Sequence, residues 1–519
     1  MGVDTELDEL LAYADRGMAV AWHARRRPTT AALIATAGTI TYGELNERAN
    51  RLARAFRRRG LERGDAVALL CSNRAEFVEV LLATQRSGLR LTTVNWHLTA
   101  EEAGYIVEDC EARAFVAEAR FADVVGGATV AAPRAHVRLA VAGSIDGFED
   151  YDAAVLAEPG DDLDDPALGS QMLYTSGTTG RPKGVFRDEA SLATAVMLAR
   201  AAYRDGNVHL LTGPLYHAAP LTFSMNAPLI AGVPIVVMPA WDPEEALRLI
   251  ERHRVTHSHM VPTMFHQLLA LPDDVRARYD VSSLRNVLHG AAPCPVGVKQ
   301  RLIEWLGPVV NEYYAATEGL GTWVDARTWL QKPGTVGKPV PEDQVVVADE
   351  EANPLPPGKV GLVWFKASEV PFEYFKDRSK TESSYRDRHF TLGDMGYVDD
   401  DGFLFLTDRS ANLIISGGVN IYPAEVDAVL LDHPAVADVA AIGVPNPEWG
   451  EEVLAVVELR AGIEPSGDLA DELVGFCRDR LSHYKCPRRV EFVDQLPRQD
   501  NGKIYKRLLR DRYRERAST

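Results

Sequence analysis

The stretch Tyr174-Thr-Ser-Gly-Thr-Thr-Gly-Arg-Pro-Lys-Gly-Val185 decides how the rest of the chain is interpreted. It follows a short apolar run ending at Leu173, which predicts a strand that runs into a turn. Glycines let backbone N–H groups point inward, hydroxyls add donors, and a lysine supplies positive charge. The stretch therefore predicts a loop that binds phosphate oxygens. The residues that would bind them are Thr175, Ser176, Gly177, Thr178, Thr179, Gly180 and Lys183.

Two other interpretations of this loop compete with phosphate binding. Many Gly/Thr-rich stretches are plain surface turns. The Walker A loop of P-loop NTPases needs Gly-Lys followed by Ser or Thr, so that a hydroxyl can hold the magnesium ion. Lys183 instead follows Pro182 and precedes Gly184, so the Walker interpretation fails.

The twelve residues resemble, nearly letter for letter, the phosphate-binding signature of the adenylate-forming superfamily. That family contains acyl-CoA synthetases, luciferases and the adenylation domains of peptide synthetases. The resemblance implies that this loop holds the β- and γ-phosphates of ATP. It covers nearly the whole chain, because further stretches resemble the family's motifs in the family's order, as far as Lys503.

Composition narrows the class of protein. At 519 residues the chain is too long for one core and predicts two or more domains. A formal net charge of −18 argues against a nucleic-acid partner. Five cysteines without a Cys-x-x-Cys pair favour thiols in a reducing cytoplasm. The longest apolar run, Ile230 to Val237, is shorter than the ~20 residues that span a bilayer, so we expect a soluble, cytoplasmic protein without a membrane span.

Hydrophobic periodicity predicts an α/β fold. Residues 41–56 and 74–87 have helical spacing, and residues 65–70 and 90–95 are typical of buried strands. The alternation returns after the phosphate loop. Its expected elements are a helix at 189–202, a strand at 209–212, a helix near 221–231, a strand at 233–238 and a helix at 242–252 that begins with Asp242-Pro243. This order predicts two doubly wound α/β subdomains, each with a parallel sheet covered on both faces.

A β-rich, barrel-like subdomain is expected from about residue 334 to 408, where short alternating runs are separated by turn residues. It would complete a large N-terminal domain of residues 1–408. Residues 409–519 predict a small α+β domain. Its expected elements are a helix at 423–431, strands at 435–444 and 453–458, a helix at 469–481 and a basic tail. The resemblance implies that this domain is mobile and rotates about Ala411, where the family usually carries Asp or Lys.

A second motif stands at Asn311-Glu-Tyr-Tyr-Ala-Ala-Thr-Glu318. By themselves a Tyr-Tyr pair is typical of a core and a single glutamate of a solvated surface. The stretch nevertheless resembles the family's Tyr-Gly-x-Thr-Glu motif, with Ala315 in place of the glycine. The resemblance implies that Tyr314 stacks on adenine, Thr317 contacts the α-phosphate and Glu318 binds Mg²⁺, which prefers hard oxygen ligands.

Two other stretches resemble the family's nucleoside-binding loops. His289–Pro293 resembles the adenine-lining loop, in which small residues let the backbone approach a flat base. Thr391–Asp394 resembles the ribose-binding Thr-Gly-Asp motif, although Leu392 stands where threonine is usual, and Arg409 matches the arginine that also holds the ribose. The residues that these motifs assign to ATP or AMP are Gly290, Ala291, Ala292, Glu312, Tyr313, Tyr314, Thr317, Asp394 and Arg409.

The stretch Leu496–Lys506 resembles the family's closing motif, in which the lysine after glycine is catalytic. That residue is Lys503, which without the other motifs would count as one more solvated lysine of a basic tail. We expect Lys506 and the arginines after it to be surface or interdomain charges. The resemblance implies that a substrate carboxylate attacks the α-phosphorus of ATP while Lys503, Thr317 and Glu318 assist. Positioning and electrostatics then suffice, without an enzyme nucleophile.

The resemblance also implies a second half-reaction, in which the thiol of CoA attacks the acyl-adenylate. Gly417 and Gly418 would line a narrow tunnel for pantetheine, which a side chain would block. Tyr484 would lie near the adenine of CoA and Arg488 near a phosphate.

The acid itself is less sharply defined by the sequence. Pro214–Leu221 matches the family segment where a His or aromatic residue gates the acyl pocket, so His217 is the candidate, against the alternative of a satisfied core histidine. The other expected pocket residues are small or flexible: Ala218, Met225, Ala316, Gly319 and Gly321. None of these residues is charged, whereas an enzyme that activates amino acids would need a charged residue to bind the α-amino group. We expect a roomy apolar pocket for a medium- or long-chain fatty acid or a bulky alicyclic acid of steroid or terpenoid type.

The expected protein is thus an ATP- and Mg²⁺-dependent acyl-CoA ligase whose partners are a small-molecule carboxylic acid, ATP and CoA. We expect it to be a monomer or a homodimer. One rival is a partial enzyme that performs a single half-reaction or loads a carrier protein; Ala315, Leu392 and Ala411 keep it open. The other rival is a non-catalytic nucleotide- or acyl-binding protein, against which the presence of Lys183 and Lys503 argues.

Overall fold

The structure is a computed structural model, and it describes residues 2–175, 182–342, 344–368, 371–409, 412–416, 419–446, 449–498 and 504–518. The chain divides into two compact units. The first unit contains residues 1–260, 271–288 and 368–382. The second contains residues 261–270, 289–367 and 383–519. Each unit is described by itself.

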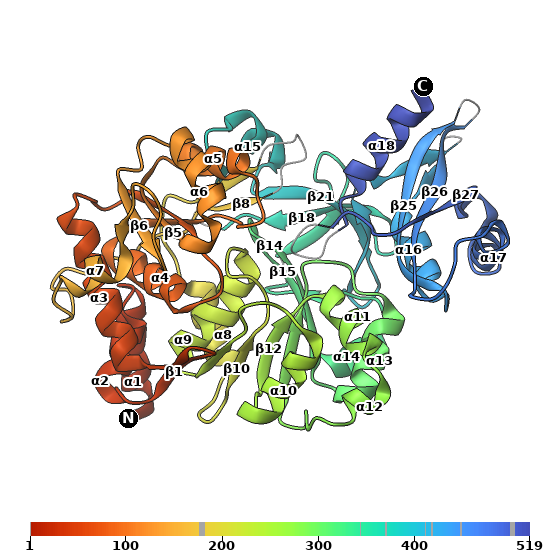
Figure 1. The fold of residues 1–519 in the computed structure, drawn as a ribbon. Helices are drawn as coiled ribbons and strands as arrows, with labels where there is room; N and C mark the ends of the chain where they lie inside the picture. Colours follow the sequence, from red (N-terminus) through yellow and green to blue (C-terminus); the bar gives the residue numbers. More distant parts are fainter. Residues whose placement is uncertain are drawn as a thin grey trace. The chain divides into compact units, whose positions relative to one another are not determined.

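The first unit contains a parallel sheet in the order β4-β3-β5-β6-β7, of which β5 and β6 are labelled in Figure 1. Its strands are β3 (Ala66–Leu70), β4 (Arg90–Thr93), β5 (Ala112–Glu118), β6 (Val137–Val141) and β7 (Glu149–Asp150). Its helices are α3 (Tyr42–Arg58), α4 (Ala75–Ser87), α5 (Ala100–Asp109), α6 (Ala122–Ala131) and α7 (Tyr151–Leu156). Successive residues of β3 enter different cores: Val67 and Leu69 pack with α3, α4 and α7, whereas Ala68 and Leu70 pack with α5 and α6. Both faces are therefore covered, as the buried apolar strands predicted.

The first unit also contains six neighbouring strands of a nine-stranded sheet, in the order β13-β12-β10-β11-β1-β2, with β12, β10, β11 and β1 parallel. These strands are β1 (Ala31–Ala35), β2 (Gly38–Thr41), β10 (His209–Leu211), β11 (Ile235–Val237), β12 (His257–Met260) and β13 (Asn286–His289). The first strand of the chain pairs with a strand two hundred residues later, Leu33 opposite Ile235 (Figure 1). The helices around it are α1 (Gly2–Ala14), α2 (Ala19–Arg26), α8 (Ala193–Ala202), α9 (Ala227–Ala231), α10 (Pro243–His253) and α12 (Asp273–Arg276).

Local signals explain most helix ends. Thr41 caps α3 through a reciprocal capping box with Glu44, and Asp242 caps α10, whose first residue is Pro243. Two expected helices differ from the structure. The helix expected from 189 begins only at Ala193 as α8, and the one expected near 221–231 consists of a π-helical segment, Pro220–Asn226, that continues into α9.

The second unit contains three neighbouring antiparallel strands, β14 (Val310–Ala316), β15 (Gly319–Val324) and β16 (Lys338–Pro339). Helices α11 (Pro262–Ala270), α13 (Val296–Leu306) and α14 (Ala326–Gln331) belong to the same unit. The expected β-rich subdomain is an antiparallel sheet in the order β17-β18-β21-β20, with β22 also paired to β21. Its strands are β17 (Val345–Ala348), β18 (Gly361–Lys366), β20 (Tyr385–Arg386), β21 (His389–Val398) and β22 (Leu404–Arg409).

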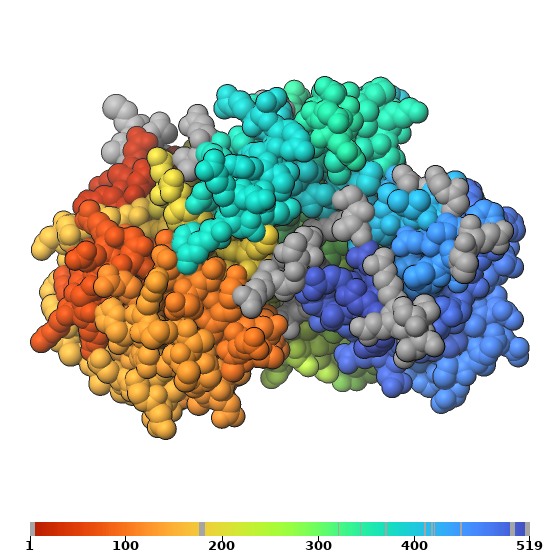
Figure 2. Space-filling view, turned by 90° about the horizontal axis from the view of Figure 1, so that it is seen from above, coloured from red at the N-terminus to blue at the C-terminus, as the bar shows by residue number. Residues whose placement is uncertain are grey.

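A separate C-terminal domain, with a sheet and hydrophobic core of its own, ends the chain (blue in Figure 2). Its sheet runs in the order β24-β23-β26-β25, with β27 paired to β26. The strands are β23 (Ile414–Ser416), β24 (Val419–Ile421), β25 (Val436–Asn446), β26 (Gly450–Leu459) and β27 (Arg489–Val493). The helices are α16 (Pro423–Leu431), with the bounds that the sequence predicted, α17 (Gly467–Arg478) and α18 (Lys506–Ser518). Within the described part of the chain, every helix is too short or too polar to cross a membrane.

Candidate active site

The predicted phosphate loop connects two strands of a hairpin in the first unit. Strands β8 (Leu173–Thr175) and β9 (Lys183–Phe186) pair antiparallel, so Thr175 and Lys183 lie opposite each other at the two ends of the loop. A distant strand, β19 (Glu373–Tyr374), pairs with β9 and makes the hairpin three-stranded. The loop residues Ser176, Gly177, Thr178, Thr179 and Gly180 lie outside the described residues.

Lys183 is held by a carboxylate that sequence reasoning missed. Its ammonium group forms an ion pair with Asp377, with the two side chains 15% and 34% exposed. The other oxygen of Asp377 accepts the backbone N–H of Lys380 at 2.9 Å, which caps α15 (Arg378–Ser384). The hydrogen bond from Lys183 lowers the pKa of Asp377. The ammonium group of Lys183, which is expected to bind phosphate, is thus already paired with the carboxylate of Asp377.

The carboxyl ends of the two parallel sheets are joined by Asn73, just past β3. Its amide nitrogen donates to the carbonyl oxygens of Gly213 and Met238, which follow β10 and β11, at 3.0 and 3.2 Å. Its amide oxygen accepts the N–H of Leu215 at 2.9 Å. Carboxyl ends of parallel strands are where α/β sheets bind ligands. The segment that carries His217 is therefore anchored at this edge.

His217 lies half-buried at the start of the π-helical segment. Its backbone carbonyl accepts from Leu221 N at 3.1 Å, and its ring lies 4.6 Å from the ring of Tyr216. Ala218 packs at the edge of the neighbouring core, whereas Met225 is fully buried within that core. On β12, His259 stacks on Phe223 at 5.3 Å, and burial lowers the pKa of His259 to about 3, so this imidazole is neutral at pH 7.

In the second unit, Thr317 and Glu318 form the two-residue turn between β14 and β15, where Ala316 pairs with Gly319. The register of this hairpin shifts between Tyr314 and Ala315, at the position where alanine replaces the family's glycine. Glu318 is only 8% exposed. A turn at the tip of a hairpin thus presents a hydroxyl and a carboxylate together.

Three motifs that lie far apart in the sequence meet beside this hairpin. The hydroxyl of Tyr314 donates to Asp394 of β21 at 2.7 Å, which joins the proposed adenine and ribose residues. A Cβ at Gly290 would lie 2.7 Å from the ring of Tyr313, so the adenine-loop glycine is required by close packing. Ala291 has φ +66, an uncommon left-handed conformation for alanine, and Ala292 is half-buried. Arg409 pairs with Asp394 across β21 and β22, and its side chain lies outside the description.

Two assigned nucleotide residues are buried. The carboxylate of Glu312 is 2.6 Å from the ammonium of Lys299 on α13, and the two side chains are 7% and 0% exposed. Burial raises the pKa of Glu312 and lowers that of Lys299, and the ion pair opposes both shifts. Tyr313 is 7% exposed, and burial raises its pKa. Both residues lie on β14, the strand that also carries Tyr314, and both are buried.

Aromatic packing gives another reason for the small residues expected in the acyl pocket. A Cβ at Gly319 would meet the Phe390 ring at 3.0 Å, and one at Gly321 would meet Phe365 at 2.9 Å. These two rings stack with their centroids 5.1 Å apart. Ala316 is half-buried. Ala316, Gly319 and Gly321 belong to the second unit, whereas His217, Ala218 and Met225 belong to the first.

The C-terminal domain places the expected CoA residues on its surface. Tyr484 is 52% exposed, and the guanidinium of Arg488 lies 5.8 Å from the ring of Trp449. Trp449, 41% exposed, had not been expected from the sequence. The predicted hinge Ala411, the tunnel glycines Gly417 and Gly418 and the catalytic Lys503 lie outside the described residues.

Glu318 is the residue that would hold Mg²⁺. Its carboxylate is the kind of hard ligand that Mg²⁺ uses, one or two at a time, together with phosphate oxygens and water. Within the described ranges, no group of three or more His, Cys, Asp or Glu side chains could hold a metal ion without such help.

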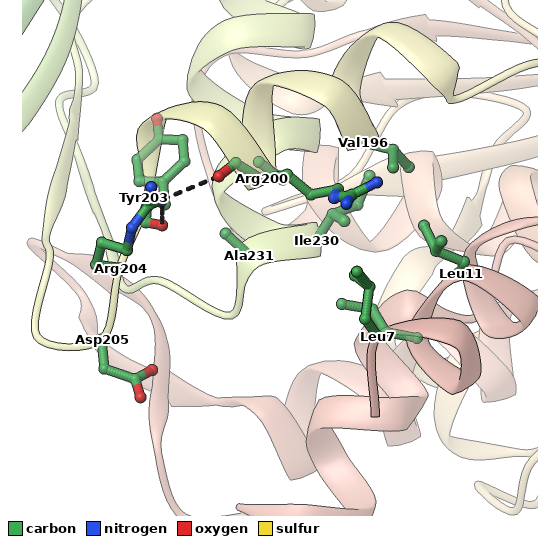
Figure 3. A pocket seen from close by; sticks show the side chains of 11 residues that line it. Leu7, Leu11, Val196, Arg200, Tyr203, Arg204, Asp205, Ile230 and Ala231 are labelled. Carbon is green, nitrogen blue, oxygen red and sulfur yellow. Dashed lines mark hydrogen bonds between the residues drawn. The ribbon is translucent and has the colours of Figure 1, made fainter. Parts of the chain in front are cut away.

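One cavity, of about 250 Å³, lies away from all of these residues, between α1, α8 and α9 (Figure 3). Leu7 and Leu11 of α1 face Val196 and Ile230, while Tyr203, Arg204 and Asp205 lie at its other end. None of the expected acyl-pocket residues lines it. The cavity therefore gives no information about the acyl pocket.

The residues that the sequence did not indicate are Asn73, Asp377 and Trp449. Each acts on a partner far along the chain: Asn73 on Gly213, Asp377 on Lys183 and Trp449 on Arg488. A weak local signal existed for Asp377, because an aspartate three residues before Lys380 suits a helix N-cap. No local pattern pointed to Lys183 as its partner.

Comparison with known proteins places this arrangement in a family. Residues 20–375 match the model of the AMP-binding enzyme family, and residues 425–503 match that of the AMP-binding enzyme C-terminal domain. A feruloyl-CoA synthase of an Amycolatopsis species is 36% identical over 498 residues, covering 94% of this chain and 97% of the relative. A fatty acid–acyl-carrier-protein ligase of Streptomyces coeruleorubidus is 34% identical over 507 residues, covering 95% of each chain. The solved o-succinylbenzoate CoA synthetase of Bacillus subtilis, in complex with its acyl-adenylate intermediate, has a TM-score of 0.80 at 28% identity and covers 95% of this chain and 98% of its own.

Proposed function

We propose, from the premise that the chain belongs to the AMP-binding enzyme family and is an AMP-forming acid–thiol ligase, that it activates an apolar carboxylic acid with ATP and Mg²⁺ and transfers the acyl group to CoA. The observation that carries this proposal is the hydrogen bond from Tyr314 to Asp394. It joins the adenine and ribose motifs beside the Thr317-Glu318 turn, as a nucleoside site requires.

The first half-reaction would use the positive charges of Lys183 and Lys503. An oxygen of the substrate carboxylate attacks the α-phosphorus of ATP, and the bond from that phosphorus to the bridging oxygen breaks, so that pyrophosphate leaves. Lys183 would neutralise the β- and γ-phosphates, Thr317 would donate to the α-phosphate, and Lys503 would orient the carboxylate. Mg²⁺ on Glu318 would supply further charge neutralisation on phosphate oxygens.

The second half-reaction needs a thiol and a place for it. The thiolate of CoA attacks the acyl carbon of the adenylate, the bond from that carbon to the phosphate oxygen breaks, and AMP leaves, while the thiol proton passes to solvent. Tyr484 and the Trp449–Arg488 pair offer two exposed aromatic rings and a cation, which suit the adenine and a phosphate of CoA.

An apolar acid is supported by the surroundings of His217. Leu215 and Tyr216 next to it are buried, and His259, which stacks on Phe223 of the π-helical segment, is neutral. The relatives are named for a fatty acid, a feruloyl group and succinylbenzoate, whose acyl parts range from alkyl to aromatic. We favour a medium- or long-chain fatty acid or a bulky alicyclic acid, with aromatic acids as the competing class.

The test is a two-part assay on the purified protein with fatty, alicyclic and aromatic acids. Pyrophosphate release is measured with ATP and Mg²⁺, and acyl-CoA formation is measured after CoA is added. Lys503→Ala should lower pyrophosphate release by about 100-fold or more, because it removes charge aimed at the transition state. Absence of pyrophosphate with every acid would refute the proposal, and preference for aromatic acids would correct its substrate class.

A carrier-protein acceptor is the second candidate, because the Streptomyces relative is named for that acceptor. This enzyme would transfer the acyl group to a phosphopantetheinyl carrier protein and be indifferent to free CoA. Single-turnover transfer from the acyl-adenylate to either acceptor, measured at equal concentrations, distinguishes the two.

A further inference from the structure

The closing motif is anchored on both sides within the C-terminal domain. Residues 499–503 lie outside the described residues, and the chain on either side of them is paired: Arg498 bridges Ile504 in antiparallel fashion, and Tyr505 N donates to the carbonyl of Pro497 at 2.7 Å. Leu496, 1% exposed, and Ile504 pack against the outer face of β25 and β26. Lys503 therefore directly precedes backbone that is held in place.

One carboxylate ties this region to the rest of the domain. Asp427 of α16 accepts a hydrogen bond from the ammonium of Lys506, the first residue of α18, at 2.5 Å. Its other oxygen accepts the N–H of Ala441 on β25, also at 2.5 Å. The side chains of Asp427 and Lys506 are only 17% and 13% exposed, so Lys506, expected from the sequence as a surface or interdomain charge, is largely buried against its partner.

The Asp427–Lys506 pair lies close in sequence to the catalytic lysine expected at position 503, so its role can extend beyond stabilising the domain. Lys506 is three residues after Lys503, and Asp427 fixes it to two elements of the domain core at once. A small displacement of a catalytic group is enough to cost a large factor in rate. Burial raises the pKa of Asp427, while Lys506 and the Ala441 N–H oppose this shift.

We propose that Asp427 is a positioning residue for the adenylation half-reaction, which acts through Lys506 to hold the backbone beside Lys503. The inference rests on the proposed function, since Lys503 acts in the first half-reaction only. It follows that loss of the Asp427–Lys506 pair lowers acyl-adenylate formation and spares the conversion of a supplied acyl-adenylate to acyl-CoA.

The chain offers a matched control on the same helix. Glu425 of α16 pairs with Lys485 at 2.5 Å, with side chains 33% and 22% exposed. This pair has the same length and is somewhat more exposed, and it ties α16 to the segment 483–485, which lies outside the closing motif. Glu425→Gln should therefore leave pyrophosphate release unchanged.

The experiment measures each half-reaction separately for wild type, Asp427→Asn, Lys506→Met, Asp427→Glu and Glu425→Gln. Asp427→Asn and Lys506→Met should lower pyrophosphate release by at least about tenfold and change acyl-CoA formation from supplied acyl-adenylate by less than about twofold. Asp427→Glu, which keeps the charge, should recover most of the first activity. Unchanged pyrophosphate release, or a parallel fall of both half-reactions, would overturn the proposal.

Hydrogen–deuterium exchange provides a readout that does not depend on activity. The Tyr505 amide, which is bonded to Pro497, should exchange faster in Asp427→Asn and Lys506→Met but not in Glu425→Gln. If wild type releases no pyrophosphate with any acid, the proposed function fails. Exchange of the Tyr505 amide then still shows whether Asp427 and Lys506 hold this backbone in place. If exchange at Tyr505 is unchanged, Asp427 does not hold this backbone, and the inference fails.

Discussion

The phosphate hairpin and the C-terminal domain each hold a lysine against an aspartate, in different surroundings. Lys183 and Asp377 are 15% and 34% exposed, and the pKa of Asp377 is lowered chiefly by its hydrogen bond with that lysine. Lys506 and Asp427 are 13% and 17% exposed, and the pKa of Asp427 is raised by burial. The first aspartate is stabilised as an anion at a partly exposed site, where the proposed phosphate ligand would compete with it for Lys183. The second is enclosed and serves as an anchor.

A third lysine–carboxylate pair, Lys299 and Glu312, is almost completely buried. We expect the largest loss of stability when this pair is broken. Lys299→Met would leave Glu312 without its ammonium partner, and removing one member of a buried ion pair costs about 3–5 kcal/mol. Urea unfolding measures the change, with Lys183→Met as the less buried control. If Lys299→Met lowers the free energy of unfolding by less than about 1 kcal/mol, burial does not determine how much these ion pairs contribute to stability.

Buried histidines provide the contrasting case of a base held neutral. Burial lowers the pKa of His259 from 6.5 to about 3, so the unfolded chain binds a proton at pH 4 that the folded chain does not. Stability is therefore full above about pH 6.5 and falls as the pH decreases toward 4, by about 3 kcal/mol for this one group. His259→Gln should reduce the slope of unfolding free energy against pH in this window. If the free energy of unfolding has the same dependence on pH in the variant and the wild type, the lowered pKa of His259 is contradicted.

At the phosphate hairpin, Lys183→Ala should lower pyrophosphate release by about 100-fold, equal to about 2.7 kcal/mol. The loss should appear with every acid, because the lysine is proposed to contact ATP and not the acyl group. The denaturation midpoint should barely change, since a partly exposed pair contributes at most about 1 kcal/mol. Equal loss in the CoA half-reaction would show that Lys183 acts elsewhere.

Asp377→Asn is expected to have the smallest effect. Asparagine keeps the helix cap through Lys380 N and removes only the charge that competes with phosphate. The KM for ATP should fall by about twofold to fivefold, an energy within the range of an exposed pair, at unchanged kcat. An increase in KM would mean that Asp377 orients Lys183 for phosphate, and the two aspartates would then have the same role.

Much of the fold follows from local patterns. The capping box at Thr41, the Asp242-Pro243 helix start and the bounds of α16 were predictable because hydrogen bonds and periodicity act within a few residues. The π-helical segment at Pro220–Asn226 was not, since its spacing of apolar residues is close to that of an α-helix.

The sequence by itself determined the order of the α/β elements, the family and the motifs that name Lys183, Tyr314, Glu318 and Asp394. Only the tertiary structure decided which partners these motifs have. It paired β1 with β11, added β19 to the phosphate hairpin, and brought Asp377 and Asp427 to their lysines. The physical reason is that such contacts join residues 79 to 202 positions apart. Sheet order and the path of the chain create them, and neither is encoded in the periodicity of any single segment.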